Sequence, residues 1–153
     1  MKAIYPSDSE FKISFIQKIV KEPRKARYIL SAIESYMSEK STEVSKNTIN
    51  VNLEHVLPRN ASGDWSDTVA SFDDKIEMLK YIYKLGNLAI MASKGNKGIG
   101  SKGFQIKSSI YLESEFETTK KIADYELWSK QAIDKRQEWL ADYALKIWRV
   151  DIE

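Results

Sequence analysis

Two amphipathic patterns at the start of the chain predict two helices. In the first, apolar residues recur at intervals of three and four, and Ser7 and Ser9 precede them as candidate N-caps. Pro23 suits the first position of the second helix, where a missing N–H costs nothing. The apolar positions are Phe11, Phe15, Ile16, Ile19 and Val20 in the first pattern, and Ala26, Ile29, Leu30, Ile33, Tyr36 and Met37 in the second. Both stripes are interpreted as core.

After residue 47 the apolar period changes from helical spacing to alternation. Residues 48–54 alternate between polar and apolar side chains, which predicts a half-buried strand. Pro58 ends this strand, because proline cannot donate to a β-ladder. Residues 59–66 contain the turn formers Asn, Ser, Gly and Asp, and they are predicted to form a loop.

The next segments predict a helix, a second strand and a glycine-rich loop. Residues 72–83 have helical spacing, with Gly86 as the C-cap. Residues 88–91 are apolar and predict a short strand, while residues 93–103 contain four glycines and predict a loop. A short helix is expected to follow it, and the final third is expected to be helical. The positions that indicate these last helices are Phe104, Lys107, Ile110 and Tyr111, then Leu127, Ile133, Arg136, Leu140, Tyr143, Ala144 and Ile147.

These elements predict an α+β fold, in which a mostly helical domain surrounds a small two-strand element. We divide the chain into an N-terminal helical segment (1–47), a core (48–112) and C-terminal helices (113–153), packed as one compact domain. The chain has no cysteine, which excludes disulfides, thiolate metal sites and cysteine nucleophiles. No apolar run approaches the length of a membrane span, and we expect a soluble, cytoplasmic protein.

Charge is unevenly distributed, although the net charge is only +2. Residues 78–112 contain six lysines and no acidic residue, so the rest of the chain is net acidic. This favours a local contact with a polyanion, and a solvated lysine-rich surface is the alternative. The candidate phosphate contacts are Lys94, Lys97, Lys102, Lys107 and, more weakly, Arg59, with packing against the site as a second interpretation of Lys107.

The residues with chemical potential cluster around the single histidine of the chain, His55. Glu54 precedes it at the strand end, Asn87 begins the second strand, and Asn96 lies in the glycine-rich loop. A carboxylate and an amide oxygen suit a hard cation such as Mg²⁺, and a neutral imidazole can take a proton from water. This set matches the needs of phosphodiester hydrolysis. The alternatives are a structural histidine, an exposed carboxylate and two turn asparagines.

Other chemistries find less support in the sequence. One histidine without cysteine does not make the usual nitrogen and sulfur zinc site. There is no Gly-x-Ser-x-Gly nucleophile elbow, and the glycines of residues 95–103 do not end in the Gly-Lys-Ser/Thr of a phosphate-binding loop.

Three motifs in order resemble the GmrSD-type HNH endonuclease family. They are LEHVLP at 53–58, LGNLAIM at 85–91 and KGNKGIGSKGF at 94–104. The likeness covers about residues 50–149, and it continues through Lys107, Tyr111, Ser114, Trp128, Ile133, Arg136, Leu140 and the closing IW at 147–148. Each motif alone is weak, whereas their order is specific.

The resemblance implies a ββα-metal (HNH) core that binds one divalent ion, Mg²⁺ or Mn²⁺. It implies that Glu54 and Asn96 are metal ligands, that His55 is the general base and that Asn87 orients this base. It further implies a DNA endonuclease of a bacterial anti-phage restriction system, joined to an N-terminal sensor domain outside this chain. The sequence leaves open nicking, double-strand cleavage and RNA cleavage. The runner-up functions are a non-catalytic nucleic-acid-binding module and a helical protein-interaction domain.

Overall fold

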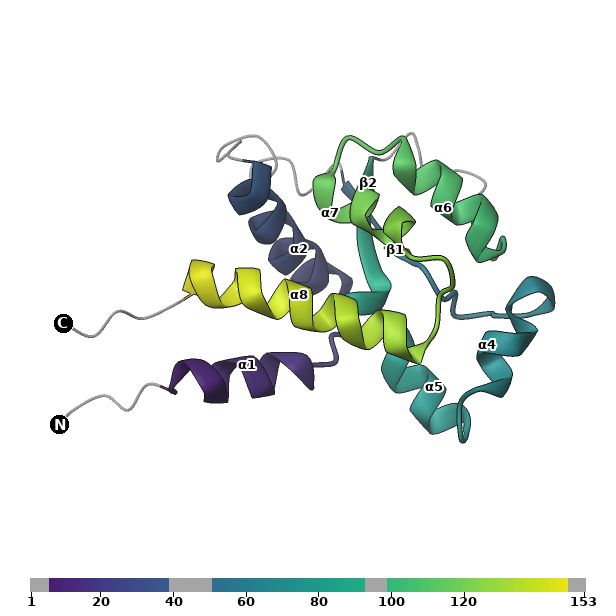
Figure 1. Cartoon of the computed structure of the whole chain (residues 1–153), viewed down its shortest axis with the longest axis horizontal. Helices are drawn as coiled ribbons and strands as arrows, with labels where there is room; N and C mark the ends of the chain where they lie inside the picture. Colours follow the sequence, from purple (N-terminus) through teal and green to yellow (C-terminus); the bar gives the residue numbers. More distant parts are fainter. Residues whose placement is uncertain (1–5, 39–50, 93–98, 149–153) are drawn as a thin grey trace, which may run out of the picture.

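The computed structural model describes residues 6–38, 51–92 and 99–148. The fold is α+β, as predicted, with helices surrounding one two-stranded sheet (Figure 1). Its elements are α1 (Asp8–Ile16), α2 (Pro23–Ser38), β1 (Val51–His55), α4 (Ser66–Ala70), α5 (Lys75–Ile82), β2 (Leu88–Ala92), α6 (Phe104–Leu112), α7 (Glu117–Lys120) and α8 (Lys130–Trp148). Short 3-10 turns occupy Gly63–Trp65, Leu85–Asn87 and Lys121–Asp124. Within the described ranges, no helix combines the length and apolar composition needed to span a bilayer.

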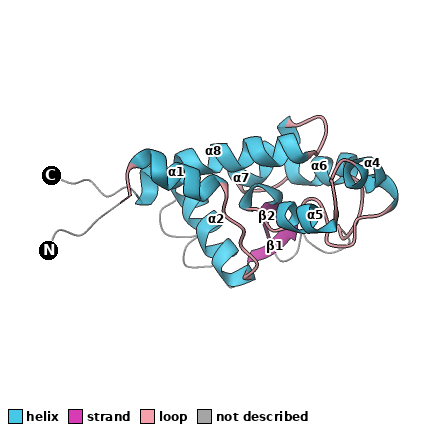
Figure 2. Cartoon of the chain, turned by 90° about the horizontal axis from the view of Figure 1, so that it is seen from below, coloured by secondary structure: helices cyan, strands magenta, loops and turns pink. Residues whose placement is uncertain are grey.

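The sheet pairs β1 with β2 in antiparallel register, with Val51 opposite Ala92 and His55 opposite Leu88. Figure 2 shows the two strands as a small part of a mainly helical body. Both faces of β2 are buried, because successive side chains of a strand point to opposite faces and helices cover each of them. Leu88 and Ile90 join one apolar cluster, and Ala89 and Met91 join a second. This explains why the segment is a continuous apolar run rather than an alternating one.

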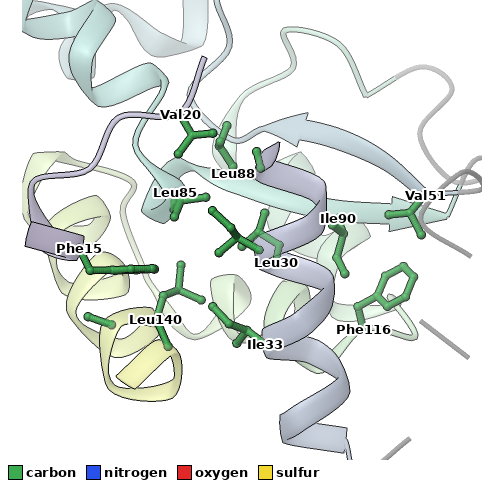
Figure 3. Close-up of a cluster of buried hydrophobic side chains, with 14 residues drawn as sticks. Phe15, Val20, Leu30, Ile33, Val51, Leu85, Leu88, Ile90, Phe116 and Leu140 are labelled. Atoms are coloured by element: carbon green, nitrogen blue, oxygen red, sulfur yellow. The ribbon is translucent and has the colours of Figure 1, made fainter. Parts of the chain in front are cut away.

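The first apolar cluster joins the two ends of the chain to the sheet (Figure 3). It takes Phe15 from α1, Leu30 from α2, Ile90 from β2 and Leu140 from α8. Helices α1 and α8 lie side by side, and the described chain begins and ends at the same end of the molecule (Figure 1). Val51 of β1 belongs to the same cluster, so the N-terminal helices share a core with the strand that carries His55.

The structure confirms both helix starts near the N-terminus. The Ser7 side chain accepts a hydrogen bond from the Glu10 backbone N–H, which completes a capping box, and α2 begins at Pro23. The first helix is shorter than the apolar spacing predicts, because Ile19 and Val20 lie beyond it. The Val20 N–H donates to the Tyr83 carbonyl at 2.9 Å, so strand-like pairing of this segment with the end of α5 replaces a further helical turn.

Other boundaries also differ from the sequence predictions. The predicted loop 59–66 contains the 3-10 turn that buries Trp65, and α4 begins at its last residue. The predicted helix 72–83 begins later, because the Asp74 side chain caps α5 by accepting from the Glu77 N–H at 2.8 Å. Leu127 is 73% exposed and precedes α8, so it does not belong to the buried face of that helix.

Gly86 has a role that differs from the predicted helix cap. Helix α5 ends with Tyr83 as its C-cap, and Gly86 lies against the backbone of α8. A Cβ atom added at Gly86 would overlap the Ile133 carbonyl oxygen and lie 3.0 Å from the Gln137 nitrogen. The residue must therefore lack a side chain for packing reasons.

We expect Gly86→Ala to lower the free energy of unfolding by about 1–3 kcal/mol, the usual cost of overpacking a buried contact. Urea unfolding followed by circular dichroism measures this loss. Gly63→Ala is a useful comparison, because its added methyl meets open space and its cost arises from the positive φ of 57° alone. An unfolding midpoint of Gly86→Ala equal to that of the wild type would contradict the close approach.

Candidate active site

His55 lies at the end of β1 and is half-buried. Its ring packs edge-on against the Tyr83 ring at the end of α5, with 5.7 Å between the ring centroids. Burial lowers the pKa of the His55 imidazole to about 4, with further contributions from the positive charges of Arg59 and Lys107. At neutral pH the imidazole is therefore uncharged and able to accept a proton.

The pocket beside His55 has a volume of about 320 Å³ and a positively charged lining. Lys21, Arg27 and Arg59 contribute cations to this lining, and it contains no acidic residue. Arg59 is one of the phosphate contacts predicted from the sequence, and Lys21 and Arg27 are lining residues that the sequence analysis does not select. A signal for them existed, because the run KEPRKAR at 21–27 holds four basic residues at the start of α2.

The neighbouring Glu54 leaves β1 on the opposite face and is buried, with 6% of its surface exposed. Its Oε1 accepts hydrogen bonds from the Lys107 ammonium at 2.7 Å and from the Tyr111 hydroxyl at 3.0 Å. Both partners belong to α6, so this charge pair attaches that helix to β1. Glu54 does not line the pocket that contains His55.

Lys107 is fully buried, which corrects the prediction that it contacts DNA phosphates. Besides Glu54, its Nζ donates to the carbonyl oxygens of His55 at 2.8 Å and Val56 at 3.0 Å. An ammonium group has three N–H donors, and these three acceptors satisfy it. Burial lowers the pKa of Lys107, and the Glu54 carboxylate opposes this shift. The position of Lys107 agrees with the second interpretation of this residue, in which it packs against the site.

Asn87 is also fully buried, and its side chain makes four hydrogen bonds. Its Oδ1 accepts from the Leu57 N–H at 2.8 Å and from the Trp128 indole N–H at 2.9 Å. Its Nδ2 donates to the carbonyls of Leu57 at 3.1 Å and Ile82 at 2.9 Å. None of these bonds reaches the imidazole. Within the described residues, Asn87 therefore fixes the backbone at Leu57, two residues after His55.

The remaining predicted site residues are divided between the surface and the part of the chain that is not described. Asn96, Lys94 and Lys97 lie outside the described residues. Lys102 is exposed, and its backbone carbonyl accepts a hydrogen bond from the Trp65 indole at 2.9 Å. The positive charge expected from the lysines of residues 78–112 is also partly neutralised, because Lys84 forms an ion pair with Asp134 at 2.8 Å.

Of the two metal ligands expected from the sequence, the structure describes one, Glu54. Within the described ranges there is no group of three histidine, cysteine or acidic side chains that could hold a metal ion. Glu54 is a hard oxygen donor, and the hydrogen bonds of its side chain use only Oε1 among the described atoms. The second expected ligand, Asn96, is not described. Any cation at Glu54 must share this carboxylate with Lys107.

A buried residue of α8 supports β2, the strand that pairs with the strand of His55. The Arg136 guanidinium is 1% exposed and donates to the carbonyls of Leu88 and Thr118, both at 3.0 Å. This confirms the interpretation of Arg136 as a buried structural arginine. The sequence analysis did not select Glu34, which has a similar structural role. Its carboxylate accepts hydrogen bonds from the backbone N–H groups of Glu117 and Thr118 at the start of α7. Helix α2 and the C-terminal helices are thereby connected.

Comparison with known proteins gives one family match. No curated protein matches the chain. The family described as GmrSD restriction endonucleases, C-terminal domain, matches residues 5–143, which include both N-terminal helices, the sheet and most of α8. Because the match spans most of the sequence, the chain belongs to the family of C-terminal domains of GmrSD restriction endonucleases.

Proposed function

We propose that this domain is an HNH-type endonuclease that hydrolyses phosphodiester bonds of DNA, with His55 as its general base. The observation that carries the proposal is the environment of His55. Its imidazole is uncharged at neutral pH, lies at a strand end and faces an open pocket lined by cations. A general base must be unprotonated to accept a proton, and a positively charged lining attracts the negatively charged phosphodiester.

The proposed reaction uses water as the nucleophile. An imidazole nitrogen of His55 takes a proton from water while the water oxygen attacks phosphorus. The bond from phosphorus to the leaving sugar oxygen breaks, and the electron pair stays on that oxygen, which takes up a proton from solvent. Asn87 positions the base indirectly, since it holds the Leu57 backbone at both its N–H and its carbonyl.

The proposal includes one divalent ion, Mg²⁺ or Mn²⁺, with Glu54 and Asn96 as its protein ligands. Glu54 lies outside the His55 pocket, so such an ion would stabilise negative charge on a phosphate and its leaving oxygen only where the DNA strand reaches both faces of β1. The carboxylate of Glu54 is held in place by Lys107 and Tyr111, which prevents it from adopting other rotamers.

We expect supercoiled plasmid to be cleaved in the presence of Mg²⁺ or Mn²⁺ and to remain intact in EDTA. Agarose gel electrophoresis separates the supercoiled, nicked and linear forms, so the same assay distinguishes nicking from double-strand cleavage. Glu54→Gln tests the metal ligand, because it keeps the size of the side chain and removes its charge. Equal cleavage with EDTA and with Mg²⁺ would contradict metal dependence.

The second candidate function is a non-catalytic nucleic-acid-binding module. The basic pocket favours it as much as it favours an enzyme, since the two functions share this charge. Such a module would bind DNA with a steep salt dependence and leave plasmid intact with every metal. His55 separates the two functions by experiment, because only the enzyme needs a proton acceptor beside the phosphate.

The wider role follows from the family and belongs to the proposal. We infer that the domain acts in the bacterial cytoplasm as the nuclease part of a restriction system against phage DNA. An N-terminal sensor domain would supply the choice of target, so the isolated domain is expected to cleave with little sequence preference.

A further inference from the structure

The pocket beside His55 gathers positive charge from separate parts of the chain. Lys21 lies in the connection between α1 and α2, Arg27 lies in α2, and Arg59 follows β1. Asn52 and Tyr83 complete the polar lining around His55. Among the described residues, no carboxylate forms an ion pair with Lys21, Arg27 or Arg59. Positive side chains that line one pocket repel one another, and a bound anion reduces this repulsion.

The fold fixes the N-terminal side of this pocket relative to His55. The Val20 N–H donates to the carbonyl of Tyr83 at 2.9 Å, and the Tyr83 ring contacts the imidazole. Immediately before Arg27, Ala26 is fully buried in the first apolar cluster, so the helix that presents the guanidinium is anchored in the core. The cations are therefore held on a rigid support next to the base.

We propose that this pocket binds one backbone phosphate of the DNA strand, with Lys21, Arg27 and Arg59 as its cationic contacts. The inference rests on the proposed function and deepens it. It assigns two of the three contacts beside the base, Lys21 and Arg27, to the helical segment before the core, and none to the lysine-rich segment 78–112. A guanidinium offers two parallel N–H donors to phosphate oxygens, which suits Arg27 and Arg59 to this ligand.

The test measures DNA binding by Arg27→Gln, with Arg24→Gln as its matched control. Arg24 is exposed on the same helix and lies outside the pocket lining, so both variants lose one charge from α2. Fluorescence anisotropy with a labelled 20-base-pair duplex is recorded in EDTA, which prevents cleavage, over a series of KCl concentrations. Thermal midpoints check that each variant is folded.

We expect Arg27→Gln to weaken binding at least about threefold and to reduce the salt slope by about one ion, as expected for the loss of one phosphate contact. Arg24→Gln should change both quantities much less, and Arg27→Lys should keep most of the salt slope. Equal weakening of DNA binding by Arg27→Gln and Arg24→Gln would overturn the inference, because it would show that DNA responds only to the overall positive charge of α2.

Two further arms separate the possible failures. In the first arm, inorganic phosphate is added as a competitor of the duplex. If the wild type binds free phosphate but Arg27→Gln leaves duplex binding unchanged, the assignment of the pocket to the DNA strand is overturned. Plasmid cleavage is measured in parallel. Loss of binding by Arg27→Gln, with no cleavage by the wild type, would support the phosphate site and refute the nuclease. If the wild type cleaves plasmid and Arg27→Gln cleaves and binds DNA as well as the wild type, only the phosphate site is refuted.

Discussion

His55→Ala protein is expected to cleave plasmid DNA at least about 100-fold more slowly than the wild type, which is the usual contribution of a general base. The reason is the loss of the proton acceptor, since His55 is the only histidine in the chain and its imidazole is uncharged at neutral pH. The basic lining of the pocket stays in place, so duplex binding in EDTA should change by no more than about twofold.

A structural histidine would give a different result, and imidazole rescue distinguishes the two cases. Free imidazole added to His55→Ala can occupy the cavity and accept the proton, so partial recovery of cleavage is expected for a base. A variant that had merely lost packing against Tyr83 would show a lower thermal midpoint and no recovery. Cleavage at the wild-type rate by His55→Ala, free of the nuclease present in a mock purification, would refute the assignment.

Lys107→Met is expected to lower the free energy of unfolding by about 3–5 kcal/mol, the cost of leaving one member of a buried ion pair without its partner. Methionine has a similar length and apolar stem, so lost volume contributes little. The variant leaves the Glu54 carboxylate buried with the Tyr111 hydroxyl as its remaining donor, and it also removes a donor from two backbone carbonyls. Urea unfolding in EDTA measures the loss.

The double variant Glu54→Gln, Lys107→Met supplies the control for this prediction. It removes the unpaired charge, and most of the lost stability should therefore return. A double variant no more stable than Lys107→Met would show that the carboxylate is not the source of the loss. A single variant as stable as the wild type would show that the buried pair contributes no net stability.

The relation between Glu54 and His55 has a consequence for the proposed chemistry. The two side chains leave β1 on opposite faces, and only His55 lines the basic pocket. Lys107 connects the Glu54 side chain to the His55 backbone, because its Nζ donates to both the Glu54 carboxylate and the His55 carbonyl. A cation bound at Glu54 would therefore also affect the backbone that carries the base.

Local sequence patterns predicted the elements that carry the candidate site. Pro23 marked the start of α2, and the apolar run of residues 88–91 marked β2. Helix α6 followed from its spacing, in which Phe104, Lys107 and Tyr111 share a face. The family resemblance then selected the single histidine, and the family match supports the endonuclease class. The predictions of these elements succeeded because periodicity depends on neighbouring residues, and the role of His55 remains part of the proposal.

The tertiary structure alone decided which charges are neutralised and which face the pocket. The partner of Lys107 is Glu54, 53 residues earlier, and only the packing of α6 across β1 brings them together. For the same reason the charge pattern selected four lysines of residues 78–112 together with Arg59, whereas Lys21 and Arg27 line the pocket beside His55 because the chain around the start of α2 packs against the sheet. A charge pattern records the sign of each residue, but the free energy of a charge depends on its burial and on partners that are distant in the sequence.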